Sequence, residues 1–130
     1  RPTSRAAIEA FKNGYDFVFV HVEGPDECGH RAEIENKVIS IEKIDSIILK
    51  SVYDYLAAGG EDFKIYVLPD HPTPIELRTH SMEPVPFFLY ESAKPQRGVA
   101  PFTEATAAST KLYYPDGSQL LNQIIEKANV

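Results

Sequence analysis

The chain has 130 residues, 43% of them hydrophobic, which fits one domain with a core of its own. The net charge of -6 and the isoelectric point near 5.2 argue against a nucleic-acid partner, because binding to phosphate backbones normally requires a basic face. No apolar run approaches the length of about 18 residues that a membrane span needs. The single cysteine, Cys28, cannot form an intramolecular disulfide, so we expect a cytoplasmic protein with no membrane partner.

The first part of the chain predicts a short helix and a buried strand. Apolar residues at helical spacing predict the helix over residues 6–11, and Gly14 ends it, because glycine readily adopts the left-handed conformation at a helix C-terminus. Residues 17–22 are almost continuously apolar, which is typical of a strand covered on both faces, as in parallel sheets. Pro25 follows the end of this strand.

A long amphipathic helix is predicted over residues 33–58. Its apolar residues recur at three- and four-residue steps and form one stripe: Ile34, Val38, Ile41, Ile44, Ile48, Val52 and Leu56. Two glycines end it, and residues 63–68 read as a second strand. A strand, a helix and a strand in this order predict a right-handed crossover with parallel strands, and thus an α/β fold whose ligands bind beyond the carboxyl ends of the strands.

The last third of the chain predicts shorter elements. Residues 85–90 read as a third strand and residues 92–101 as a loop. A short helix is predicted over residues 103–108 with Thr103 as its N-cap, and Asp116 or Ser118 is expected to cap a final helix.

Metal-ligating side chains follow the first two predicted strands. Asp26 and His30 are four residues apart and can face one ion if the long helix begins near them. Asp70 and His71 are neighbours at a strand end, where adjacent side chains point in opposite directions, so they require either two ions or a turn. His80 follows nine residues after His71. A mixed set of imidazoles and carboxylates favours zinc, manganese or iron over calcium. The alternative is a helix-capping aspartate and ordinary surface histidines.

Three motifs in this order resemble cofactor-independent phosphoglycerate mutases of the archaeal-type branch, in the alkaline phosphatase superfamily. The motifs are Pro25-Asp26-x-x-Gly29-His30, Pro69-Asp70-His71-Pro72-Thr73-Pro74 and Arg78-Thr79-His80 followed by Pro84-Val85-Pro86-Phe87. The resemblance runs from about Tyr15 to Tyr90 and continues more weakly to the C-terminal helix. It implies a partial three-layer sandwich with a mainly parallel sheet. Residues 1–130 would then be the C-terminal part of a metal-binding catalytic domain.

The resemblance also implies a ligand set and a reaction. Asp26, His30 and His80 would hold one divalent ion, and Asp70 and His71 would help to hold a second. The ions would be manganese or magnesium, with zinc possible. The family interconverts 2-phosphoglycerate and 3-phosphoglycerate in glycolysis and gluconeogenesis through a phosphoserine, without 2,3-bisphosphoglycerate.

The nucleophilic serine that the resemblance implies is missing from this chain. Four serines lie in helix-like segments and match no nucleophile motif: Ser4, Ser40, Ser46 and Ser51. We therefore expect no catalytic residue here, an inactive fragment, and a serine supplied by the rest of the same polypeptide. The absence of an initiator methionine suggests a longer chain. The alternatives are a related phosphotransferase or phosphatase acting on another small phosphate ester, or a metal-binding fragment without catalysis.

Five further polar residues have weaker claims to the site. Arg78 is a candidate for a substrate phosphate, although an arginine there pairs with a structural carboxylate about as often. His21 is expected to be a hydrogen-bonded core histidine rather than a ligand. Cys28 can bind zinc, but packing is the preferred interpretation. Glu23 and Glu27 are candidates to orient a histidine ring.

Overall fold

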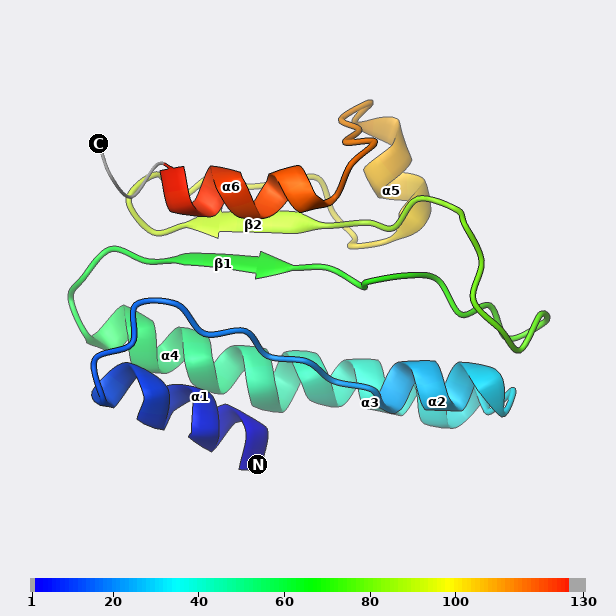
Figure 1. Cartoon of the computed structure of the whole chain (residues 1–130), viewed down its shortest axis with the longest axis horizontal. Coiled ribbons are helices and arrows are strands. Elements are labelled where there is room, and N and C mark those ends of the chain that lie inside the picture. Colours follow the sequence, from blue (N-terminus) through cyan, green and yellow to red (C-terminus); the bar gives the residue numbers. More distant parts are fainter. Residues whose placement is uncertain (1, 127–130) are drawn as a thin grey trace. The chain divides into compact units, whose positions relative to one another are not determined.

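The computed structural model describes residues 2–126 (Figure 1). The chain divides into two compact units, one formed by Arg1–Glu61 with His71–Glu83 and the other by Asp62–Asp70 with Pro84–Val130. The predicted domain 1–130 also includes Arg1 and residues 127–130, which lie outside the described residues. A single domain over the whole chain stays a prediction.

The first unit is built from helices. They are α1 (Pro2–Lys12), α2 (Gly24–His30), α3 (Ile34–Lys43), the π-helical segment η1 (Ile44–Leu49) and α4 (Lys50–Ala58). Figure 1 shows α3, η1 and α4 as one continuous ribbon, so the predicted helix over residues 33–58 is confirmed, with an unpredicted π-helical stretch in its middle. Gly14 follows α1 at φ 88° and Gly60 follows α4 at φ 76°, as expected of residues that end helices.

The strand predicted over residues 17–22 is wrong for this structure. These residues, all of them described, form neither helix nor strand. Phe17 is 51% exposed and Phe19 is 77% exposed, although the pattern predicted cover on both faces. The physical reason is that a strand exists only through hydrogen bonds to a neighbouring strand, and this segment has no pairing partner among the described residues.

The short helix α2 separates the first predicted metal ligands from the long helix. Pro25 lies in its first turn, where its fixed φ suits a helix start and its missing N–H is not needed. Ala32 takes a left-handed conformation at φ 57°, and α3 begins only at Ile34. The condition stated for Asp26 and His30, that the long helix begins near them, is therefore not met: they lie in a short helix of their own, because the left-handed Ala32 separates it from the long helix.

The second unit contains the sheet. Strand β1 (Lys64–Val67) pairs with β2 (Phe88–Glu91) in antiparallel register, Ile65 opposite Tyr90 and Tyr66 opposite Leu89. The predicted strands over residues 63–68 and 85–90 are thus confirmed with shorter bounds. The parallel crossover is not formed, because its first strand is absent, and among the described residues this antiparallel pair is the sheet. The structure supports the α/β class but not the parallel three-layer sandwich.

Two helices follow the strands in the second unit. They are α5 (Glu104–Ser109) and α6 (Ser118–Glu126). The Thr103 hydroxyl accepts a hydrogen bond from the Thr106 N–H at 3.1 Å, which confirms the predicted cap of α5. A carboxylate oxygen of Asp116 accepts one from the Ser118 N–H at 3.0 Å, at the start of α6. None of the described helices is long and apolar enough to cross a membrane.

Few of the described side chains are buried. Ala7, Cys28 and Leu120 are buried, and among the described residues no large side chain is fully buried. Cys28 is thus packed in the interior, as expected from the sequence. Thr73 is only 5% exposed although its side chain is polar. A buried hydroxyl needs hydrogen-bond partners, and those of Thr73 lead to the candidate site.

Candidate metal centre

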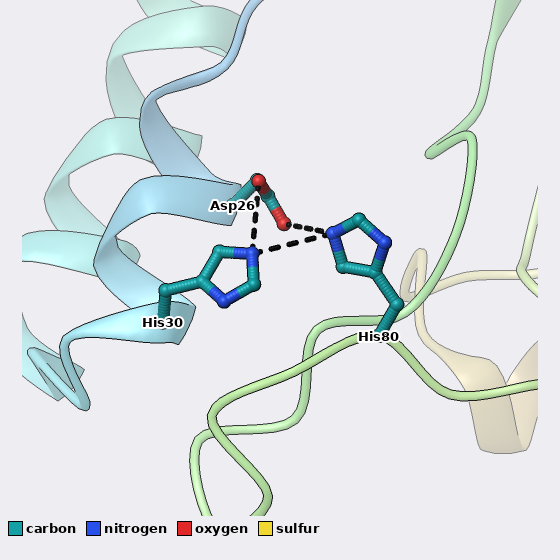
Figure 2. A group of neighbouring side chains, drawn as sticks. All are labelled: Asp26, His30 and His80. Carbon is teal, nitrogen blue, oxygen red and sulfur yellow. Dashed lines mark hydrogen bonds and ion pairs between the residues drawn. The ribbon is translucent and has the colours of Figure 1, made fainter.

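Three side chains of the first unit meet at one point, as Figure 2 shows. The Nε2 atoms of His30 and His80 are 3.3 Å apart. Asp26 presents one carboxylate oxygen to each ring, Oδ2 at 3.4 Å from His30 Nε2 and Oδ1 at 3.2 Å from His80 Nε2. We call Asp26, His30 and His80 the triad. Although 50 residues separate its two histidines in sequence, they lie together as expected.

Helix α2 supplies two members of the triad. Asp26 and His30 are one helical turn apart, so they lie on the same face of α2. The side chains of Asp26, His30 and His80 are 34%, 41% and 50% exposed, respectively. The triad is therefore open enough for an ion or a small substrate to reach it from solvent.

A proline-bounded loop, residues 71–81, supplies His80. The Ser81 N–H donates to the Pro72 carbonyl at 3.3 Å and the Arg78 N–H donates to the Pro74 carbonyl at 2.9 Å, so the loop folds back on itself. Its two histidines stack with ring centroids 3.6 Å apart, His71 on His80. The turn brings His80 back to the first part of the loop and next to α2.

A backbone carbonyl fixes the His30 ring. His30 Nδ1 lies 2.9 Å from the Arg78 carbonyl oxygen, and because a carbonyl can only accept, Nδ1 carries the hydrogen. In the neutral ring Nε2 then has a free lone pair, and it is Nε2 that faces Asp26 and His80. This is the arrangement that metal-binding histidines usually adopt. Arg78 itself takes a left-handed conformation at φ 52°.

The triad fits a small cation. With Nδ1 as donor, His30 Nε2 and the Asp26 carboxylate are both acceptors, and two acceptors at 3.4 Å repel unless a positive charge lies near them. Two ligand atoms about 2.1 Å from an ion are roughly 3.0 to 3.4 Å apart in octahedral to tetrahedral geometry. The observed separations of 3.2 to 3.4 Å match this range. Among the described residues, the triad is the cluster of potential metal ligands whose atoms lie close enough together to bind one ion.

Thr73 holds the Asp26 carboxylate from the loop. Its hydroxyl donates a short hydrogen bond to Asp26 Oδ1. This bond lowers the pKa of the Asp26 carboxyl below its ordinary value of 3.8. Partial desolvation opposes the shift, and the positive charges that His30, His80 and His71 carry when protonated add to it. The carboxylate is thus kept ionised, as a metal ligand must be.

Helix α3 holds the same loop through Lys37. The Lys37 ammonium group donates to the Thr73 carbonyl oxygen at 2.6 Å. Gly29 lets α2 approach closely, since a Cβ there would lie 2.6 Å from the same carbonyl oxygen. Sequence reasoning missed both Lys37 and Thr73. The one available signal was the position of Thr73 between two prolines of the recognised motif, and nothing in the local pattern pointed to Lys37.

Among the residues that the structure describes, Asp70 and His71, which were assigned to a second ion, do not belong to a ligand group like the triad. Asp70 is exposed and belongs to the second unit, whereas His71 belongs to the first. The backbone bends at both residues, after β1 has ended at Val67, so the alternation of an extended strand does not apply to them. Their role in a second site stays a prediction.

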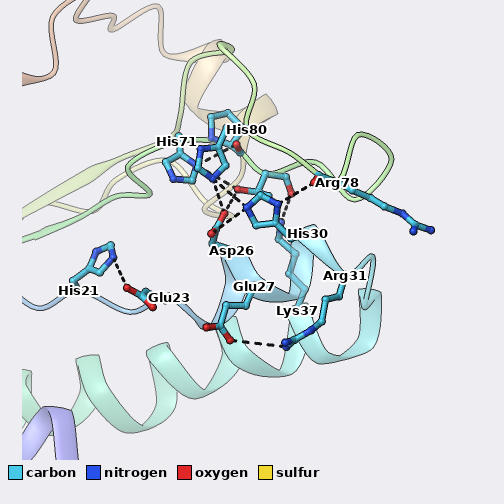
Figure 3. Close-up of polar contacts among 12 residues, drawn as sticks. His21, Glu23, Asp26, Glu27, His30, Arg31, Lys37, His71, Arg78 and His80 are labelled. Carbon is cyan, nitrogen blue, oxygen red and sulfur yellow. Dashed lines mark hydrogen bonds and ion pairs between the residues drawn. The ribbon is translucent and has the colours of Figure 1, made fainter.

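The weaker candidates take other positions, visible in Figure 3. The Arg78 side chain points away from the triad, and its carbonyl is what contacts His30. His21 is not in a core, because the strand expected to bury it is absent; its side chain is 51% exposed and lies 3.9 Å from Glu23. Glu27 lies 3.9 Å from Arg31 rather than orienting a histidine.

Gly29→Ala tests the close approach of α2 to the loop. We expect the substitution to lower the free energy of unfolding by about 1–3 kcal/mol, because the new methyl group would overlap the Thr73 backbone and force α2 away. Gly24→Ala in the same helix is the control, since its Cβ would meet Ser40 at an ordinary 3.7 Å. Urea unfolding measures both, and equal changes for the two variants would contradict the prediction.

The Asp26 carboxyl should titrate below 3.8 in the metal-free protein. Because the folded-state pKa is the lower one, this group stabilises the fold above its ordinary pKa, and that stabilisation is lost as the pH falls through the folded value. Thr73→Val should raise the pKa, whereas Thr73→Ser should keep it low. Carboxyl ¹³C shifts followed by NMR measure the titration, and an unchanged value in Thr73→Val would refute the assigned cause.

Several curated proteins are similar to this chain in sequence. A 2,3-bisphosphoglycerate-independent phosphoglycerate mutase of Methanosarcina mazei is 43% identical over 123 residues, which cover 94% of this chain and 31% of the relative. A second such protein, from Methanothermobacter thermautotrophicus, is 40% identical over 98% of this chain and 31% of its own length. A probable one from Geobacter sulfurreducens is 37% identical over 94% of this chain and 30% of its own.

The chain thus spans about 30% of the length of the curated relatives it matches. No solved structure matches it. The model of the Metalloenzyme superfamily matches residues 2–121, which include the whole triad and the loop that carries His80. By this match, the chain belongs to the Metalloenzyme superfamily.

Proposed function

We propose that this chain is the metal-binding part of a cofactor-independent phosphoglycerate mutase. In this proposal the triad, Asp26, His30 and His80, holds one divalent ion, and Asp70 and His71 contribute to a second. The ions are manganese or magnesium, with zinc possible, and the substrates are 2- and 3-phosphoglycerate. We place the protein in the cytoplasm, in glycolysis and gluconeogenesis.

The geometry of the triad carries the proposal. Three ligand-type side chains from two distant segments meet with atom separations that suit one ion, and the hydrogen bond from His30 to the Arg78 carbonyl leaves the facing nitrogen without a hydrogen. Relatives named as phosphoglycerate mutases match more than nine-tenths of the chain. Membership of the Metalloenzyme superfamily implies that a divalent metal is bound, and the names of the relatives suggest which reaction is catalysed.

Exposed apolar side chains support the proposal that the chain is one part of a larger catalytic domain with a mainly parallel sheet. Phe17 and Phe19 lie in a segment whose composition is that of a strand covered on both faces, yet both are more than half exposed. Further strands beside residues 17–22 would provide the missing cover and hydrogen bonds. The nucleophilic serine would come from the same additional part of the polypeptide.

The chain's own residues would prepare the site for phosphoryl transfer. When bound, divalent ions would neutralise phosphoryl oxygens and lower the pKa of an attacking hydroxyl. Asp26, His30 and His80 provide the ligand atoms, and Thr73 keeps the carboxylate ionised. The Arg78 side chain is exposed and points away from the triad, so in this proposal it would turn towards the ions to bind a substrate phosphate in a bidentate manner.

Metal binding tests the triad. Asp26→Ala and His80→Ala should each weaken Mn²⁺ binding by at least about 100-fold, because each removes one of three protein ligands. Isothermal titration calorimetry gives the affinity and the stoichiometry, which we expect to be one ion for the 130-residue chain. His21→Ala is the matched control, since His21 lies outside the triad. An equal loss in His21→Ala would exclude the triad as the site.

Conversion of 3-phosphoglycerate tests the reaction. With Mn²⁺ and without added 2,3-bisphosphoglycerate, the full-length protein should form 2-phosphoglycerate, which enolase converts to a product that absorbs at 240 nm. Asp26→Ala should lower kcat/KM by at least about 100-fold, because the ion that neutralises the phosphoryl group is lost. Hydrolysis of other small phosphate esters, with no mutase activity, would instead support a related phosphatase.

A further inference from the structure

Thr73 contacts both groups of proposed ligands from a buried position. Its hydroxyl oxygen is hydrogen-bonded to Asp26 Oδ1 and lies 3.3 Å from His71 Nδ1. Its side chain is thus within hydrogen-bonding distance of a member of the triad and of a residue proposed for the second ion. At 5% exposure, it has almost no access to water as an alternative partner.

The partners of Thr73 and His71 indicate the direction of the hydrogen bonds between them. The Pro72 carbonyl lies 3.3 Å from His71 Nδ1 and can only accept, so Nδ1 carries the hydrogen. The Thr73 hydroxyl oxygen accepts a hydrogen bond from this N–H. The Thr73 hydroxyl hydrogen is donated to the Asp26 carboxylate, which can only accept. In the neutral His71 ring, Nε2 is then the nitrogen that carries no hydrogen.

We infer that Thr73 is a positioning residue that couples the two proposed ion sites, by orienting the Asp26 carboxylate and fixing the His71 tautomer through one hydroxyl group. The inference rests on the proposed metal-binding function. It differs from the ligand assignment because Thr73 itself binds no ion. Figure 3 shows Asp26, His30, His71 and His80 gathered together, with Lys37 reaching towards them from α3.

Two backbone contacts keep Thr73 in place for this role. The Lys37 ammonium group binds its carbonyl oxygen at 2.6 Å, and Gly29 of α2 packs directly against the same atom. A movement of Thr73 would therefore disturb both helices. The hydrogen bond from Lys37 involves the main chain of residue 73, so a change of the side chain leaves it intact. The Thr73 methyl group also lies beside Gly29, and Thr73→Val keeps a methyl group at that position.

The test compares Thr73→Val, which has nearly the same shape but no hydroxyl, with Thr73→Ser, which keeps the hydroxyl. Thr73→Val should weaken Mn²⁺ binding by about 10-fold, as is usual when a partner of a metal ligand is lost, and Thr73→Ser should stay within about 3-fold of the unsubstituted protein. In the metal-free protein, the ¹⁵N shifts of the His71 ring should show a mixture of tautomers in Thr73→Val and one tautomer in Thr73→Ser.

Thr103→Val controls for a general loss of stability. It removes the cap of α5 and should lower the unfolding temperature without changing Mn²⁺ affinity.

If Asp26→Ala abolishes Mn²⁺ binding while Thr73→Val changes neither the Mn²⁺ affinity nor the ¹⁵N shifts of His71, the inference is wrong and the proposed metal site is retained. If Asp26→Ala has no effect on Mn²⁺ binding, the proposed function itself fails, and the inference with it.

Discussion

The candidate site depends on the close approach of α2 to the loop over residues 71–81. A glycine at position 29 permits it, since any side chain there would collide with the backbone of Thr73. Lys37 draws the same carbonyl group towards α3. Once these two contacts exist, Asp26 and Thr73 are within hydrogen-bonding distance and the Arg78 carbonyl meets the His30 ring. The triad therefore follows from a backbone contact that involves none of its own side chains.

The helices could be predicted from the sequence because their signals are local. The stripe over residues 33–58 and the glycines that follow α1 and α4 each depend on neighbours a few positions away. The pairing of Asp26 with His30 is local as well, since one helical turn separates them. In contrast, nothing in a periodic pattern joins His30 to His80; the recognised motifs supplied that expectation, and the structure confirms their proximity.

The failures of the sequence-based predictions concern interactions over long distances. The segment over residues 17–22 has the composition of a buried strand, but composition cannot supply the neighbouring strands that would make it one, and the described residues hold none beside it. Lys37 and Thr73 were missed for a related reason. A helix lysine and a threonine between prolines are ordinary in isolation, and their meaning comes only from the tertiary contact that joins them.

The separation of the two triad histidines has a consequence for folding. An ion shared by His30 and His80 would act as a cross-link that closes a loop of 50 residues. By the chain-entropy relation for cross-links, closing such a loop destabilises the unfolded ensemble by roughly 4 kcal/mol at 25 °C. Such an ion would hold residues 71–83 against the helices of the first unit. The ion would thereby have a structural role as well, because it would stabilise a unit that has few buried side chains.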